Sequence, residues 1–577
     1  MKNNLKILFV SSEVAPFAKT GGLADVAGSL PQAIKKEGHD IRVVMPQYGQ
    51  IPQEYLQNLE HQLHFRTRVG WRDDYVGVNC LEREGVITYF IDNKNYFNRS
   101  SLYDNEDKHV QFAYFCRTVL EMLPKINFQP DIIHCNDWQT GPLSIMLKEN
   151  YQIYDFYKEI RTVYTIHNLR YQGVFGKEVL DDVLGLHSKY WDWGVVCHDD
   201  CINYMKMGIE MSDMITTVSK TYATEIKIPY FGEGLDYVLR MNSDDLYGIV
   251  NGISYQENDP TSDNRIYANY SIDDLSGKYE NKRKLQEDMG LPTRTDVPVI
   301  SLISRLVEQK GLDLISTVID ELLQEDIQLI ILGTGEYVYE EMFKKIGWRY
   351  PNKVSANIRY DGNLAQKIYA GSDIFLMPSK YEPCGLGQLF SLRYGTIPVV
   401  RETGGLNDTI NSYNEVTEEG NGFTFRNYNA HDMLYTIRRA INYYRQPELW
   451  EKLVKKAMSS DFSWNNSANE YIKLYCRLLG LEQEEIDKNK EVETKVLKLN
   501  MDLEKKSEGI GNSAQKVNLN LASKELLTNL KGVGPSLAGR IIDYRSKAGS
   551  FKDLNELKQV KGVGTKLFGE LRKLLTY

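Results

Sequence analysis

Short apolar runs alternate with helical patterns over most of the chain, and they form two series. The first comprises 7–10, 41–46, 86–92, 131–137 and 161–168, and the second comprises 298–306, 327–335, 358–362, 373–379 and 396–402. Strands that alternate with helices are typical of parallel sheets with crossover helices. The pattern therefore predicts an α/β fold with two parallel-sheet domains and a cleft at the carboxyl ends of the strands.

The chain opens on a predicted strand, glycine turn and helix. The motif Lys19-Thr20-Gly21-Gly22 follows the first apolar run, and apolar residues then recur at helical spacing as far as Ile34. The glycines let a ligand approach the backbone, and the lysine favours an anion such as phosphate. The alternative is a tight turn with a solvated lysine. Pro31 predicts a kink or an early end of this helix.

The second series carries cations and glycine turns at its strand ends. In chain order these are Arg305 and Lys310, then Gly333 and Gly335, then 378–386 with Cys384, Gly385 and Leu386, and finally Thr403, Gly404 and Gly405. Each motif alone is commonly structural. Together and in this order they suit a diphosphate, whose negative charge must be stabilised when a nucleotide leaves.

Glu382 lies between an aromatic residue and a proline-cysteine-glycine turn, directly after a predicted strand. A carboxylate there can accept a hydrogen bond from a sugar hydroxyl or stabilise positive charge at an anomeric carbon. The alternative is an N-terminal cap of a helix that begins near Gly385.

Polar residues also follow two strands of the first series. His134 to Trp138 end one apolar run, and His167 and Asn168 end the next. Such groups can hold a sugar, whereas a single histidine is more often a satisfied structural residue. Two histidines at strand ends favour a binding role.

Composition limits the class of protein. A chain of 577 residues with 42% hydrophobic and 25% charged residues is expected to form two to four globular domains. No apolar run approaches the length of a membrane span, and the N-terminus lacks a signal-peptide cleavage pattern. Seven scattered cysteines favour a reducing, cytoplasmic location. Cys197 to Cys201 lacks a second ligand pair, so no metal is expected.

The C-terminal end differs from the acidic body of the chain. Residues 517–577 contain 11 Lys and Arg against 5 Asp and Glu, in a chain whose net charge is −9. The run Leu530 to Pro535 recurs as Val560 to Thr565, which predicts a duplicated glycine hairpin between helices. We expect domains at 1–250 and 251–483, the latter with a closing helix at 463–479, a charged linker at 484–516 and an all-α tail at 517–577.

With these residues assembled, residues 4–480 resemble the bacterial glycogen synthases and the plant starch synthases. The resemblance rests on KTGGLADV at Lys19, HCNDWQTG at His134, TIHNLRYQG at Thr165, TVSKTYATEI at Thr217, FGEGLD at Phe231, GIVNGI at Gly248, SRLVEQKG at Ser304, LGTGE at Leu332, YEPCGLGQL at Tyr381 and RETGGLNDT at Arg401. It implies two Rossmann-like domains in the glycosyltransferase B architecture. It also implies retaining transfer of glucose from ADP-glucose to the non-reducing end of an α-1,4-glucan, without a cofactor or metal.

The resemblance also implies roles for individual residues. Lys19, with Gly21 and Gly22 shaping its loop, would contact the donor from the opposite domain. Arg305 and Lys310 would stabilise the leaving diphosphate. Glu382 would hold the donor glucose, His167 would contact a sugar hydroxyl, and Asp137 and Asn168 would line the sugar site.

The chain departs from the family pattern at three positions. Asn136 and Gln139 stand where the family often has histidines, and Phe390 stands where related transferases have a second glutamate. We therefore expect Glu382 to act without a carboxylate partner. The first two changes bear on acceptor affinity.

The tail resembles the helix-hairpin-helix domain of bacterial competence DNA-uptake proteins. The resemblance implies that two hairpins offer backbone N–H groups and lysines to DNA phosphates, through Lys531, Gly532, Gly534, Lys561, Gly562 and Gly564. The alternative is a small module that binds a protein or a polysaccharide granule.

Three functions remain open at the level of sequence. The first is a glucan synthase, the second a nucleic-acid-binding protein with a repurposed transferase body, and the third another retaining transferase that forms sucrose or trehalose. Intact Lys19, Arg305, Lys310 and Glu382 favour an enzyme. The KTGGL and EPCGL motifs favour the glucan synthase.

Overall fold

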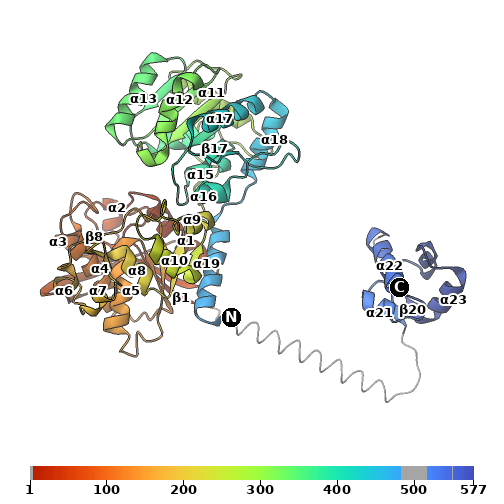
Figure 1. Ribbon diagram of the computed structural model, residues 1–577, viewed down its shortest axis with the longest axis horizontal. Coiled ribbons are helices and arrows are strands. Elements are labelled where there is room, and N and C mark those ends of the chain that lie inside the picture. Colours follow the sequence, from red (N-terminus) through yellow and green to blue (C-terminus); the bar gives the residue numbers. More distant parts are fainter. Residues whose placement is uncertain (1–3, 482–515, 549) are drawn as a thin grey trace. The chain divides into compact units, whose positions relative to one another are not determined.

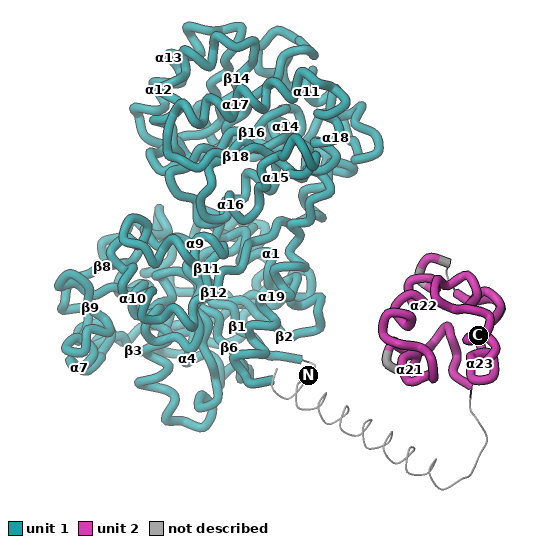
Figure 2. Tube along the Cα trace, turned by 45° about the vertical axis from the view of Figure 1, so that its right-hand side comes forward, with its two compact units in different colours: residues 1–484 teal, residues 485–577 magenta. Residues whose placement is uncertain are grey.

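The computed structural model describes residues 4–481, 516–548 and 550–577 (Figure 1). The chain divides into two compact units, residues 1–484 and 485–577 (Figure 2). The described part of the first unit holds two large sheets and a small three-stranded one (β8-β10-β9), and we call the parts built on the two large sheets the first and the second lobe. The predicted linker at 484–516 lies, apart from Lys516, outside the described residues.

The first lobe is built on a nine-stranded sheet in the order β12-β11-β7-β6-β1-β2-β5-β4-β3. Its strands are β1 (Lys6–Val10), β2 (Asp40–Pro46), β3 (Glu60–Val69), β4 (Arg72–Arg83), β5 (Val86–Asp92), β6 (Ile132–Asn136), β7 (Arg161–Ile166), β11 (Met214–Thr217) and β12 (Leu246–Gly248). The strands from β12 to β5 are parallel, as predicted, and β4 and β3 add an antiparallel edge. The β3–β4 hairpin was not predicted, because β3 is half-exposed and has no apolar run.

Helices cover the sheet of the first lobe. The main ones are α1 (Gly22–Lys36), α4 (Lys108–Met122), α5 (Gly141–Met146), α8 (Tyr204–Met211), α9 (Lys220–Glu225) and α10 (Asp236–Met241). Helix α1 continues through Pro31, so the early end expected there is wrong. Burial of Leu30, Pro31 and Ile34 offsets the lost backbone hydrogen bond.

The second lobe is built on a six-stranded parallel sheet in the order β15-β14-β13-β16-β17-β18. Its strands are β13 (Val299–Ile303), β14 (Gln328–Leu332), β15 (Val354–Asn357), β16 (Ile374–Met377), β17 (Ile397–Arg401) and β18 (Phe423–Phe425). Its main helices are α11 (Ser276–Asp288), α12 (Leu312–Leu322), α13 (Tyr337–Arg349), α14 (Gly362–Gly371), α15 (Gly387–Arg393), α16 (Gly404–Thr409), α17 (Ala430–Tyr444) and α18 (Pro447–Met458). The strand expected at 358–362 lies earlier, at β15, and Gly362 instead begins α14.

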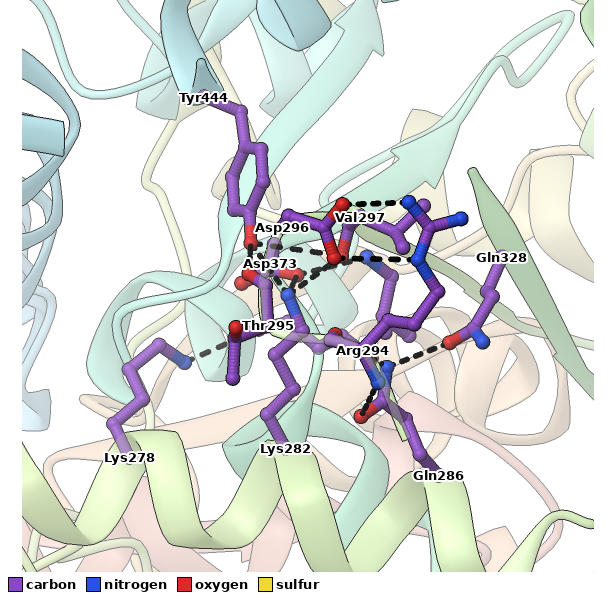
Figure 3. Close-up of polar contacts among 12 residues, drawn as sticks. Lys278, Lys282, Gln286, Arg294, Thr295, Asp296, Val297, Gln328, Asp373 and Tyr444 are labelled. Carbon is purple, nitrogen blue, oxygen red and sulfur yellow. Dashed lines mark hydrogen bonds and ion pairs between the residues drawn. The ribbon is translucent and has the colours of Figure 1, made fainter. Parts of the chain in front are cut away.

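A buried polar network holds α11 against the amino ends of these strands (Figure 3). Lys278 donates hydrogen bonds to the carbonyl groups of Ala370, Ser372 and Tyr394 at 2.9–3.2 Å. Lys282 pairs with Asp373 at 2.7 Å. Burial lowers the pKa of Lys278 to about 7. This network lies at the sheet edge opposite to the motifs, so it stabilises the lobe.

The last helix of the first unit returns to the first lobe. Helix α19 (Trp464–Leu478) packs beside α1, and Tyr471 and Tyr475 belong to the core of the first lobe (Figures 1 and 2). The chain crosses between the lobes twice, once near Ile253 and once near Ser463, and these two residues form a β-bridge. The closing helix expected in the second domain therefore packs on the first lobe.

The second unit has a core of its own. It comprises β19 (Val517–Asn518), α21 (Lys524–Thr528), α22 (Pro535–Ala548), a 3₁₀ segment η5 (Leu554–Gln559), α23 (Thr565–Leu574) and β20 (Leu575–Thr576). Leu527, Ile541, Phe568 and Leu571 are among its buried residues. The glycine hairpins at 530–535 and 560–565 lie between its helices, as the repeat predicted.

Candidate functional site

The predicted site residues follow the carboxyl ends of strands in both lobes, and the two sets approach each other. Gly22 of the first lobe lies so close to Leu386 of the second that a Cβ on Gly22 would be 3.8 Å from Leu386 Cδ1. Arg170 donates a hydrogen bond to the Tyr381 hydroxyl at 3.3 Å. A cavity of about 290 Å³ between the lobes is lined by Arg170, Tyr230, Phe231, Glu233, Glu308, Gln309, Lys380 and Tyr381.

Glu382 and Lys310 form a largely buried ion pair. Lys310 Nζ lies 2.6 Å from Glu382 Oε2, and the two side chains are 14% and 8% exposed. The Ser379 hydroxyl donates to the same oxygen at 2.9 Å. Helix α15 begins at Gly387 with Leu386 as its N-cap, so the capping alternative for Glu382 is wrong. Phe390 packs against Tyr369.

Arg305 follows β13 on the same edge and differs from Lys310 in its surroundings. Its side chain is exposed, and no carboxylate of the described residues pairs with it. Because the Arg305 guanidinium is exposed, it can bind a phosphate group bidentately without first breaking an ion pair.

The glycines after β14 shape the edge of the sheet. A Cβ on Gly333 would lie 1.9 Å from the Ser304 carbonyl oxygen, and a Cβ on Gly335 would lie 2.3 Å from that of Leu306. The Gly333 N–H donates to the Asn357 carbonyl and the Gly335 N–H to Glu340. Their N–H groups are thus engaged, and close backbone packing explains both glycines.

The turn from Cys384 to Leu386 offers backbone groups. The Cys384 side chain is buried, and burial raises the pKa of its thiol to about 12. Gly385 has a φ of +73°, which favours glycine. None of the described residues accepts a hydrogen bond from the N–H of Gly385 or Leu386. These two N–H groups can therefore serve an anionic ligand.

Thr403 to Gly405 already have protein partners. The Thr403 hydroxyl and the Gly404 N–H donate to Glu225 of the first lobe. The Gly405 N–H donates to the Glu382 carbonyl at 3.1 Å. The turn from Thr403 to Gly405 thus contacts the backbone of Glu382 on one side and Glu225 of the first lobe on the other.

Glu13, which sequence reasoning missed, holds the loop of Lys19. Glu13 is 4% exposed and accepts hydrogen bonds from the Thr20 N–H, the Thr20 hydroxyl and the Gly21 N–H. Tyr103 donates to the same carboxylate at 2.9 Å. Lys19 is half-exposed and pairs with Asp25 at 2.6 Å. Glu13 therefore fixes the backbone of the loop, while the side chain of Lys19 stays accessible to solvent.

Asp137 and Asn136 fix His167 in one orientation. Asp137 has a φ of +56°, and its Oδ1 accepts hydrogen bonds from the N–H groups of His167 and Asn168. Burial raises the pKa of Asp137 to about 7. His167 Nε2 lies 2.9 Å from Asn136 Oδ1, and the Asn136 amide donates to the carbonyls of Val10 and His134.

The charge and tautomer of His167 follow from these contacts. Burial lowers the pKa of His167 to about 3, so the ring is neutral near pH 7. Because Asn136 Oδ1 can only accept, Nε2 carries the proton and Nδ1 is the acceptor. Asn136, a departure from the family pattern, thus sets the tautomer of His167.

His134 does not belong to the site. It is fully buried, and its two ring nitrogens lie 2.7 Å from the Tyr475 hydroxyl and 2.6 Å from the Thr165 hydroxyl. It joins α19 to the sheet. The structural alternative therefore holds for His134, and the idea of two histidines in one cleft is wrong.

Two other observations concern metals and membranes. Within residues 4–481, 516–548 and 550–577, no three His, Cys, Asp or Glu side chains are grouped as metal ligands. Cys197 to Cys201 form the hairpin of β9 (Cys197–His198) and β10 (Cys201–Asn203). Among the helices of the described part, none combines the length and hydropathy needed to cross a bilayer.

The hairpins of the second unit pack reciprocally. Gly532 and Gly562 have φ values of +88° and +106°. A Cβ on Gly532 would contact Leu567 of α23, and a Cβ on Gly562 would contact Arg540 of α22. Each hairpin also has an exposed lysine and an exposed second glycine: Lys531 and Gly534 in the first, Lys561 and Gly564 in the second. No described residue accepts a hydrogen bond from the N–H of Gly534 or Gly564.

Two further residues near the site, Tyr360 and Glu225, were not predicted from the sequence. Tyr360 is 84% exposed just after β15, on the edge that carries Arg305 and Gly333. Glu225 reaches the second lobe from the end of α9. Tyr360 fell within the strand predicted at 358–362, so its place after the strand gave no signal, and nothing in the sequence links Glu225 to Thr403.

The two facing lobes, each with glycine turns and charged groups at its strand ends, define a glycosyltransferase of the two-domain class. Matches to family models are consistent with this class: residues 6–241 match the starch synthase catalytic domain, 285–459 match glycosyl transferases group 1 and 512–576 match the helix-hairpin-helix motif. The glycogen synthase of Clostridium novyi (strain NT) is 52% identical over 476 residues, 82% of this chain and 99% of that protein. That of Geobacillus stearothermophilus is 50% identical over 479 residues, 83% of this chain and 99% of that protein. The chain belongs to the glycogen synthase family and is a glycosyltransferase.

Solved structures agree with this fold. The catalytic domain of starch synthase IV from Arabidopsis thaliana, bound to ADP and acarbose, superposes with a TM-score of 0.77 at 33% identity and covers 83% of this chain and 100% of that one. A sucrose-phosphate synthase from Thermosynechococcus elongatus has a TM-score of 0.51 at 15% identity, covering 83% of this chain and 100% of that one, which is a likeness of fold alone.

Proposed function

We propose that the enzyme transfers glucose from ADP-glucose, with retention of configuration, to the non-reducing end of an α-1,4-glucan. The observation that carries this proposal is the Lys310–Glu382 pair, together with the exposed Arg305 in the same segment after β13. It combines cations for a departing diphosphate with a carboxylate for the sugar on one sheet edge. The relatives named glycogen synthases, and the starch synthase structure with bound ADP, support it.

The leaving group is stabilised by the second lobe. Arg305 and Lys310 bind the diphosphate, and the N–H groups of Gly385 and Leu386 add neutral donors beside it. Lys19 adds a further positive charge from the first lobe. Gly333 and Gly335 let the strand ends pack closely around the nucleotide. Tyr360 offers an exposed ring on which the purine can stack.

The sugar lies between Glu382 and His167. Glu382 accepts a hydrogen bond from a hydroxyl of the donor glucose, and the Nδ1 acceptor of His167 takes another near the reacting carbon. Asp137 and Asn168 line the sugar site, with Asp137 also holding the turn of His167. Attack on the donor's front face, with the leaving phosphate taking the acceptor proton, accounts for retention without an enzyme nucleophile. A double displacement is the alternative mechanism.

A comparison of donors tests this proposal. Glycogen is incubated with the full-length enzyme and either ADP-glucose or UDP-glucose, and glucose incorporation is measured. We expect rapid incorporation from ADP-glucose and little from UDP-glucose. Equal incorporation from both donors contradicts the proposed donor, and incorporation from neither contradicts the proposed reaction.

A second function for the tail rests on its hairpins. We propose that the second unit binds duplex DNA without sequence preference, because exposed lysines and unengaged N–H groups recur at both hairpins. Full-length protein and the variant Lys531→Ala/Lys561→Ala are compared in a duplex-DNA shift assay over a range of salt. We expect binding that weakens with salt and weakens further in the variant. Absence of a shift at low salt favours a protein or a polysaccharide granule as the partner.

A further inference from the structure

The two lobes of the first unit cap each other's helices. Glu225, the last residue of α9 in the first lobe, accepts hydrogen bonds from the Thr403 hydroxyl at 2.9 Å and the Gly404 N–H at 3.0 Å. These groups begin α16 of the second lobe. In return, Asp408 of α16 accepts from the hydroxyls of Ser219 and Thr221 at 2.6 Å and from the Thr221 N–H at 3.1 Å, at the start of α9. Figures 1 and 2 show α9 and α16 side by side.

These contacts are stronger than ordinary surface pairs. The first N–H groups of a helix have no partner within the helix, and a carboxylate satisfies them with charge-assisted hydrogen bonds. Thr403 is the N-cap of α16 and makes no capping bond of its own, so Glu225 supplies the cap. Thr403 and Ser219 are fully buried. These donors are therefore shielded from water, while the Glu225 and Asp408 side chains that accept from them are half-buried.

The cap supplied by Glu225 leads directly to the site. After Thr403 and Gly404, the Gly405 N–H donates to the Glu382 carbonyl at 3.1 Å. Gly404 approaches the same carbonyl so closely that a Cβ would lie 1.9 Å from its oxygen. The first turn of α16 thus supports the backbone of Glu382, whose carboxylate pairs with Lys310.

We propose that Glu225 is a positioning residue for glucosyl transfer: from the first lobe, it fixes the first turn of α16 and thereby the backbone of Glu382 in the second. The inference rests on the proposed function. Glu225 touches no reacting atom. It makes the placement of the sugar-binding carboxylate depend on the correct approach of the two lobes.

The variant Glu225→Gln tests this role. The amide keeps the length of the side chain and can still bond to both groups, because the Thr403 hydroxyl can accept as well as donate, but it removes the negative charge from the cap. We expect kcat with ADP-glucose to fall about tenfold, because both hydrogen bonds weaken when the charged acceptor becomes a neutral amide. Affinity for ADP alone, measured by calorimetry, should stay within about twofold, because the cap acts on the sugar side of the site.

A matched control has the same chemistry on the same side of the interface. Glu470 on α19 pairs with Lys220 of α9 at 3.5 Å, and both side chains are well exposed. Glu470→Gln should keep the wild-type kcat. Thr403→Val removes the hydroxyl that faces Glu225 and should lower kcat as well. The double variant with Glu225→Gln should lose less than the product of the two single losses.

The outcomes are distinct. A folded Glu225→Gln enzyme with wild-type kcat overturns the inference, as does an equal loss in Glu470→Gln. If Glu225→Gln does not fold, the Thr403→Val enzyme decides: wild-type kcat overturns the inference, and a loss of kcat with unchanged ADP affinity supports it. A folded wild-type enzyme that transfers no glucose from ADP-glucose refutes the proposed function, and the inference with it.

Discussion

Removal of Lys310 should destabilise the second lobe far more than removal of an exposed lysine. In Lys310→Met, Glu382 stays 8% exposed without its partner at 2.6 Å, and only the Ser379 hydroxyl still contacts the carboxylate. Loss of one member of a buried ion pair costs about 3–5 kcal/mol, because the other charge remains buried. The pair is less than a third exposed, so solvent screening does not reduce this figure to that of a surface pair.

The size of the effect can be read as a melting temperature. For a domain of about 150–250 residues, 1 kcal/mol corresponds to about 2–4 °C, so Lys310→Met should melt at least about 6 °C below wild type. Glu382→Gln alone leaves Lys310 unpaired and should also melt lower. Lys310→Met/Glu382→Gln removes both charges and should recover a large part of the loss.

Calorimetric or fluorescence melting of the four proteins, each with a parallel assay of glucose transfer, separates stability from chemistry. All three variants should be nearly inactive, even where the double variant regains stability, because both charges act on the donor. A double variant that melts at the sum of the two single losses refutes the reasoning, since the two charges then act independently. Lys380→Met removes a half-buried lysine whose partner Glu308 is exposed; it is the control and should melt within about 2 °C of wild type.

Three further predictions concern other parts of the first unit. Lys19→Ala should raise KM for ADP-glucose and lower kcat, measured by initial rates, and wild-type constants would refute its role as a donor contact. Glu13→Gln should raise KM for ADP-glucose several-fold with little change in melting temperature, because the loop of Lys19 loses a shared acceptor; an unchanged KM contradicts this. Burial lowers the pKa of Lys278 in the folded protein to about 7, below the roughly 10.4 of an unfolded lysine. Between about pH 7 and about pH 10.4, the unfolded chain therefore binds more protons than the folded one, so the free energy of unfolding should rise with pH in this range. Lys278→Met should remove this rise in melts between about pH 7 and pH 10, and an equal rise in both proteins would contradict the assignment.

Much of the fold was predictable because it depends on local pattern. Buried parallel strands are continuous apolar runs, and most of the predicted runs are strands of the two sheets. The hairpin of β3 and β4 escaped prediction, because one of its faces is exposed and its pattern is weak. Strand β15 was placed a few residues late, since the apolar residue Ile358 follows the strand and drew the prediction past its end.

The candidate site was only partly predictable. Residues directly after strands, such as Arg305, Glu382 and His167, could be found because parallel strands bring their carboxyl ends to one edge. Contacts between distant segments could not: Glu225 and Thr403 are 178 residues apart, and His134 meets Tyr475 across 341 residues. Such pairs depend on how α19 and α16 pack, which no local spacing reveals.

The most direct test of the central claim joins the reaction to Glu382. Labelled glucose from ADP-glucose is offered to glycogen with wild type and with Glu382→Ala, and the product is digested with an enzyme that releases maltose from non-reducing α-1,4 ends. The account predicts that wild type incorporates label and that digestion releases it as maltose, while a folded Glu382→Ala protein incorporates almost none. Label that resists this digestion, or wild-type incorporation by Glu382→Ala, would contradict it.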